Sequence, residues 1–75
     1  MQHFDSTEGK YANYFQIGHN AVEFIVEFGQ LYSDATVPLL HTRIITTPPY
    51  AKTLLKLLQE ALAEHEAQFG PSREA

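Results

Sequence analysis

The sequence predicts an α+β domain in which a three-stranded antiparallel meander is followed by one long C-terminal helix (β-β-β-α). A start signal and a stop signal enclose a helix over residues 48–69, and residues 22–28 alternate apolar and polar with period two. We expect the helix to pack across the apolar face of the sheet. The single domain should span residues 10–70, between a flexible arm over 1–9 and a disordered tail over 71–75.

The first two strands are predicted by β-favouring residues on either side of a turn. Residues 11–17 contain three aromatic side chains, and residues 18–21 read as the turn. In residues 22–28 every even position is apolar, whereas Glu23 and Glu27 occupy the other face. The sequence therefore predicts a β-hairpin with one apolar face.

A register for this hairpin follows if His19 and Asn20 form a two-residue loop. The aromatic side chains then line up on one face, and a slip of one residue would turn them toward water. The predicted pairs are Ile17 with Val22, Phe15 with Phe24, Asn13 with Val26, and Tyr11 with Phe28.

A ten-residue connection with a turn at Ser33 and Asp34 leads to a third strand over residues 39–46. Alternation along this strand places Leu40, Thr42 and Ile44 on one face, and His41, Arg43 and Ile45 on the other.

Residues that start and end helices flank the predicted helical segment on both sides. Thr47 is a capping residue type and Pro48 suits the first helical position, whereas Gly70 and Pro71 end the helix. An apolar stripe recurs at three- and four-residue spacing and is widened by Leu57. Its members are Ala51, Leu54, Leu55, Leu58, Ala61, Leu62, His65 and Phe69.

The helix is long for its sheet, which favours an oligomer. About 22 residues span roughly 33 Å, whereas the strands span about 23 Å, so the helix should overhang by about two turns. The overhang carries Leu62, His65 and Phe69. A 75-residue chain without cysteine cannot use disulfides to support a small core. We expect a homo-oligomer, with a dimer favoured.

Two further features point to interfaces. The second sheet face should present Tyr14, Ile25 and Ile45 within a polar rim that includes Arg43, the usual composition of a partner-binding patch. Asn13 falls on the apolar face, where its amide needs hydrogen-bond partners. It bonds to a loop backbone or caps a bulge at the start of the strand, serves as a polar specificity residue at a subunit interface, or contacts a ligand.

Charge and hydropathy exclude some partners. The formal charge is −4, and the five cations are scattered, so we expect no nucleic-acid binding. No apolar run approaches the ~20 residues that span a bilayer, and the N-terminus lacks the pattern of a signal peptide. We expect a soluble, cytoplasmic protein that does not bind membranes.

The sequence offers no catalytic, cofactor-binding or metal-binding constellation. Its four histidines show no i, i+4 or X-x-X spacing, and there is no cysteine. Glu23 and Glu27 lie about 13 Å apart along one strand face, too far to share a proton. Arg43 can pair with either glutamate. We therefore expect no enzyme activity, no metal and no cofactor.

A series of short motifs follows one another along residues 10–70: Tyr11-Ala12-Asn13, His19-Asn20, Glu23-Phe24, Glu27-Phe28, Arg43-Ile44-Ile45, Thr47-Pro48, Ala51-Lys52 and Gln68-Phe69-Gly70. In this order and spacing they resemble a bacterial family of small uncharacterised proteins, the domain-of-unknown-function 3467 family. Asn20 and Thr47 stand where that family has serine, and Pro49-Tyr50 replaces an acidic-histidine pair. The resemblance implies a strand-strand-strand-helix domain and no established activity.

These features predict a non-enzymatic protein-interaction or oligomerisation module, an accessory or adaptor subunit of a bacterial complex. One alternative is a small dimeric transcription regulator that binds DNA. A second is a small-molecule-binding protein with its site at a dimer cleft near Asn13 and His41. The interface candidates are Tyr14, Ile25, Ile45, Arg43, Leu62, His65 and Phe69.

Overall fold

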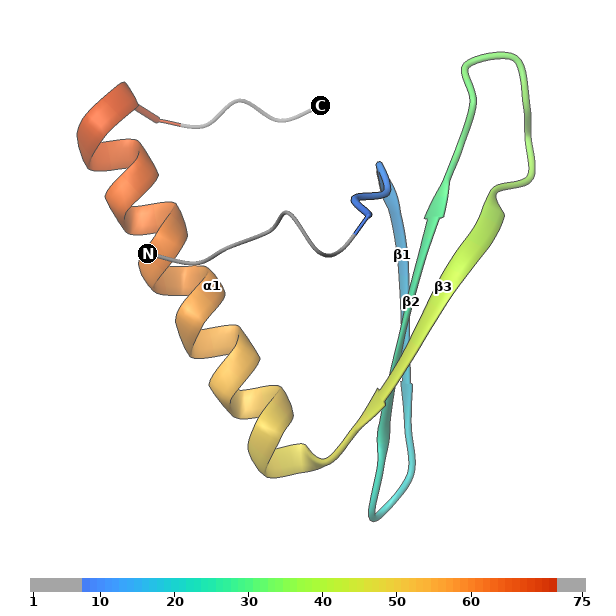
Figure 1. Cartoon of the computed structure of the whole chain (residues 1–75), viewed down its shortest axis with the longest axis horizontal. Coiled ribbons are helices and arrows are strands. Elements are labelled where there is room, and N and C mark those ends of the chain that lie inside the picture. The colour runs from blue at the N-terminus through green and yellow to red at the C-terminus, as the bar shows by residue number, and fades with distance from the viewer. Residues whose placement is uncertain (1–7, 72–75) are drawn as a thin grey trace.

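The computed structural model describes residues 8–71. The predicted arm and tail fall largely on residues 1–7 and 72–75, which lie outside the described residues. The elements are β1 (Tyr14–His19), β2 (Phe24–Gln30), β3 (Leu39–Thr46) and α1 (Pro48–Phe69). The strands form one antiparallel sheet in the order β1-β2-β3, and the helix follows β3 (Figure 1). The predicted α+β class is confirmed.

The first hairpin has a longer loop than the predicted one. Phe15 lies opposite Phe28 rather than Phe24, so the register is shifted by four residues. The four residues between β1 and β2 are held by Asn20, whose Oδ1 accepts the N–H groups of Val22 and Glu23 at 2.9 and 2.8 Å. An Asx turn of this kind replaces the two-residue loop. Because the shift is even, every side chain keeps its predicted face.

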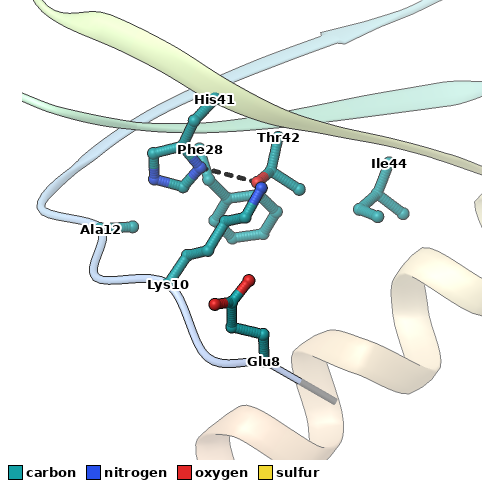
Figure 2. A pocket seen from close by; sticks show the side chains of 7 residues that line it. All are labelled: Glu8, Lys10, Ala12, Phe28, His41, Thr42 and Ile44. Atoms are coloured by element: carbon teal, nitrogen blue, oxygen red, sulfur yellow. Dashed lines mark hydrogen bonds between the residues drawn. The ribbon is translucent and has the colours of Figure 1, made fainter.

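A β-bulge interrupts the pairing of β2 with β3. Phe28 lies opposite Thr42 and Gly29 opposite Leu40, so His41 is an extra residue on β3. The bulge places Leu40 on the face of Gly29, whereas His41 points to the face of Phe28 and Thr42 (Figure 2). The predicted faces of Leu40 and His41 were therefore wrong, because one inserted residue breaks the period of two.

Gly29 makes the bulge sterically possible. It is buried, and a Cβ at this position would lie 2.5 Å from the carbonyl oxygen of Leu39. Every other residue type has a Cβ, so the close approach of β3 requires glycine here.

Asn13 extends the pairing of the hairpin by one residue before the start of β1. Its backbone N–H donates to the carbonyl of Gly29 at 3.1 Å. Its side-chain Nδ2 donates to the Leu31 carbonyl at 3.2 Å, and Oδ1 accepts the Leu31 N–H at 2.8 Å. The amide therefore replaces a missing backbone partner for Leu31, which accounts for an asparagine on an otherwise apolar face.

The helix begins and ends at the predicted residues. Thr47 is extended and its hydroxyl makes no capping bond, while its carbonyl accepts the Ala51 N–H at 2.8 Å. Prolines at the first two helical positions, Pro48 and Pro49, have no N–H that would need a cap. At the other end Gly70 has φ 89° and donates its N–H to the Glu66 carbonyl at 2.8 Å.

The helix does not pack on the sheet of its own chain. It leaves β3 at an angle and stands away from the sheet over its length (Figure 1). Among residues 8–71 no apolar side chain is buried. Thr47 alone separates β3 from α1, and its extended backbone sets the direction in which the helix leaves the sheet. The predicted packing of the helix across the sheet is therefore absent within one chain.

Candidate protein-protein interface

One face of the sheet is apolar and open, and we call it the inner face. Its apolar members lie on the same side of the sheet as Phe28 in the register: Phe15, Ile17, Phe24, Val26, Phe28 and Ile44. The rings of Phe15 and Phe28 meet edge to face with centroids 5.8 Å apart. Phe15 is nevertheless 57% exposed, Ile17 66% and Ile44 49%. The inner face therefore has the composition of one side of a hydrophobic core but is not covered by a second layer.

His41 fixes the chain before β1 across this inner face. Its Nε2 lies 3.0 Å from the Tyr11 carbonyl oxygen, and its Nδ1 lies 2.6 Å from the Thr42 hydroxyl. A carbonyl can only accept, so Nε2 donates, and a neutral ring then accepts the hydroxyl proton at Nδ1. The bulged histidine therefore has a structural role, which strict alternation along β3 could not predict.

A shallow hollow of about 410 Å³ lies beside His41 on the inner face. Side chains from the sheet line one side of the hollow and side chains from the segment before β1 line the other (Figure 2). The lining residues are Phe28, His41, Thr42 and Ile44 of the sheet, and Glu8, Lys10 and Ala12 of that segment. The hollow lies near the cleft predicted from Asn13 and His41. Asn13 does not line it, however, because its amide bonds to Leu31.

The second open surface is the helix stripe, defined above as the apolar positions of α1. The leucines are evenly exposed, from 48% for Leu62 to 58% for Leu57, so no side of the stripe is covered. His65 packs against Phe69 one turn further on, with ring centroids 4.9 Å apart. The predicted interface residues Leu62, His65 and Phe69 thus lie together on one accessible surface.

The opposite side of the sheet, which we call the outer face, has the predicted apolar pair at its centre. Ile25 lies opposite Ile45, and Tyr14 is half-buried on the same face. Arg43 donates from its Nε to Oε2 of Glu27 at 2.9 Å, and its second nitrogen lies 2.7 Å from the same oxygen. Leu40 joins this face in place of His41.

Within residues 8–71 no three His, Asp or Glu side chains lie close enough together to hold a metal ion. His19 stacks on Phe24 at a centroid distance of 5.3 Å, whereas His41 and His65 have other partners. In the same part of the chain, no helix has the length and apolarity required to cross a membrane.

The exposed surface is large for the mass. A folded monomer of this size exposes about 4,700 Å² by the scaling of surface with mass. This chain of 8.5 kDa exposes 7018 Å². Counting the eleven residues outside 8–71 at the exposure of an unfolded chain still leaves an excess of about 1,000 Å².

The chain matches one family model, that of a protein of unknown function (DUF3467), over residues 3–73. Neither the comparison with curated proteins nor the comparison with solved structures finds a match. Because the family model covers nearly the whole chain, the chain belongs to the DUF3467 family.

Proposed function

We propose that this member of the DUF3467 family is a non-enzymatic oligomerisation module whose hydrophobic core is completed by a second copy of the chain. The observation that carries the proposal is that no apolar side chain in residues 8–71 is buried. Burial of apolar surface is the dominant favourable term in folding. A chain without it cannot offset the conformational entropy that it loses on folding.

The size of the open surface supports a dimer. The area that two copies expose in excess of two folded monomers of this mass lies between about 2,000 and 4,700 Å². Obligate homodimers bury about 2,000 to 5,000 Å² in total, and their interfaces resemble a domain core cut in half. The inner face and the helix stripe are two such halves on one chain. A second copy therefore supplies enough surface, of the right kind, to cover both.

The outer face supports the finer proposal of an accessory or adaptor subunit in a bacterial complex. If the inner face and the helix stripe are used between copies, the outer face remains available to a different protein. Its apolar centre of Ile25 and Ile45 lies beside the polar pair of Glu27 and Arg43. We propose a cytoplasmic location for this role, with which a chain without cysteine is compatible.

Light scattering coupled to size-exclusion chromatography, from about 1 to 100 µM, tests the proposal. The expected result is a dimer or a larger species of fixed mass. Its thermal midpoint should rise with protein concentration, because association stabilises only the folded form. A folded monomer with a midpoint independent of concentration would refute the proposal.

A further inference from the structure

Within the helix stripe, a narrower set of positions repeats with regular spacing along α1. Its central positions alternate steps of four and three residues, which is the heptad spacing of a helix that pairs with another helix. These six positions, which we call the pairing line, are Ala51, Leu55, Leu58, Leu62, His65 and Phe69. All of them except half-buried Ala51 are exposed in the single chain. The line runs over nearly the whole of α1.

The charges of α1 are arranged against its own dipole. Lys52 and Lys56 lie in its first half and Glu60, Glu64 and Glu66 in its second half, with no acidic residue in the first turn and no basic residue in the last. The N-terminal end of a helix favours anions and its C-terminal end favours cations. In addition, Lys56 precedes Glu60 by four residues, which is the weaker order for an ion pair along one helix. This order disfavours the isolated helix.

An antiparallel partner makes the same order favourable. Lys52, Gln59 and Glu66 are seven residues apart and line one flank of the pairing line. In an antiparallel pair this flank faces the same flank of the partner in reverse, so each lysine meets a glutamate and Gln59 meets the partner's Gln59. In a parallel pair the flank faces the other flank, which consists of Leu54, Ala61 and Gln68 and offers no charge.

We propose that two copies join through their α1 helices, packed antiparallel about a two-fold axis near residues 59–61. This inference rests on the proposed function and names its geometry. The central layers pair Leu58 with the partner's Leu62 across both sides of the axis. Further out, Ala51 meets the partner's Phe69, so the smallest side chain of the line faces the largest. Leu55 faces the partner's His65.

The arrangement also gives the rest of the stripe a role. Leu54, Leu57 and Ala61 lie beyond the pairing line, on the side away from Lys52. A stripe limited to the pairing line is the width of a two-helix contact, whereas a wider stripe covers a further surface. The open inner face of the sheet, with Phe15 and Ile44 about half exposed, is that surface.

Crosslinking between single cysteines tests the direction of the pair, and the cysteine-free chain permits it without further changes. Q59C should be crosslinked to itself by a short bismaleimide. K52C alone and E66C alone should not, because the two copies of either residue lie about 20 Å apart along the axis at 1.5 Å per residue. A mixture of K52C and E66C should give a mixed crosslinked dimer. K56C, on the outer side of the helix, is the matched control for random collision.

Charge exchange tests the flank contact by a second route. K52E places two pairs of like charges across the dimer, so the dissociation constant should rise about tenfold or more. E66K should act likewise, and K52E combined with E66K should return the constant to within about threefold of the original. K56E, the matched control, should leave the constant unchanged.

The outcomes separate this inference from the proposed function. A monomeric wild-type chain would overturn both. A dimer in which K52C is crosslinked to itself would show a parallel pair and overturn the inference alone. A dimer in which neither Q59C nor the K52C and E66C mixture gives a product would show that copies join elsewhere, and it would overturn the inference while leaving the oligomer.

Discussion

The substitution Leu58→Ala should affect stability differently, in size and in sign, if α1 has no partner or if it is paired with a second copy. In the single chain the Leu58 side chain is 54% exposed. Substitutions at such positions usually change the free energy of unfolding by about 0.5 kcal/mol or less, and alanine favours the helix slightly. If α1 has no partner, Leu58→Ala should therefore be neutral or mildly stabilising.

In the antiparallel pair the same side chain lies in the two central layers. Truncation of a buried leucine costs about 2–5 kcal/mol, and the dimer contains two copies of the residue. A total of about 4 kcal/mol or more raises the dissociation constant roughly a thousandfold, since each 1.4 kcal/mol is a factor of ten. A dimer stable at nanomolar concentration would then dissociate at micromolar concentration.

Sedimentation equilibrium at several concentrations measures the constant directly, and circular dichroism records the loss of helix that should accompany dissociation. Lys56→Ala serves as the control, because it changes an exposed residue on the outer side of the same helix. If Leu58→Ala keeps the wild-type mass and thermal midpoint across the whole range, Leu58 is not in an interface and the reasoning fails.

Three other substitutions test the sheet. Asn13→Ala removes both side-chain bonds to Leu31 and should lower the free energy of unfolding by about 1–3 kcal/mol, whereas a melt unchanged from wild type would show that the amide is dispensable. Gly29→Ala places a Cβ 2.5 Å from the Leu39 carbonyl oxygen. It should move the amide resonances around the bulge and cost more than the ~1 kcal/mol typical of a point mutation, and unshifted spectra would contradict the steric argument. Arg43→Ala breaks a pair in which Arg43 is 65% exposed, so denaturant titration should show a loss of only about 0.2–1 kcal/mol, and a larger loss would mean that the outer face is covered.

The sequence predicted the helix and the third strand with correct bounds, because their signals are local. Two prolines start the helix and a glycine with positive φ ends it. These residues restrict or free their own backbone, and no distant contact can change that. The faces of the first hairpin were predicted for a similar reason, since the face on which a side chain lies alternates with position along the strand.

The register and the bulge were not predicted because other contacts decide them. Asn20 holds a four-residue loop with its side chain, although a two-residue loop was equally consistent with the residue types. The bulge depends on Gly29 meeting the backbone of another strand. A glycine inside a strand pattern signals such an approach. The predicted ten-residue connection before residue 39 includes Gly29, so the sequence pattern alone did not predict the exchange of Leu40 and His41.

The packing of the helix shows what an apolar pattern can and cannot specify. The stripe on α1 predicts that something apolar covers it, and the inner face of the sheet was the nearest candidate in the chain. The pattern itself does not distinguish a surface of the same chain from that of a second copy. Two other features do: Thr47 alone joins β3 to α1, and the charges of α1 oppose its own dipole. The extended Thr47 directs the helix away from its own sheet in this conformation, and the charge order suits an antiparallel partner. The sequence therefore specifies one half of a hydrophobic core within one chain. By our proposal, it also specifies the antiparallel orientation of the second copy that supplies the other half.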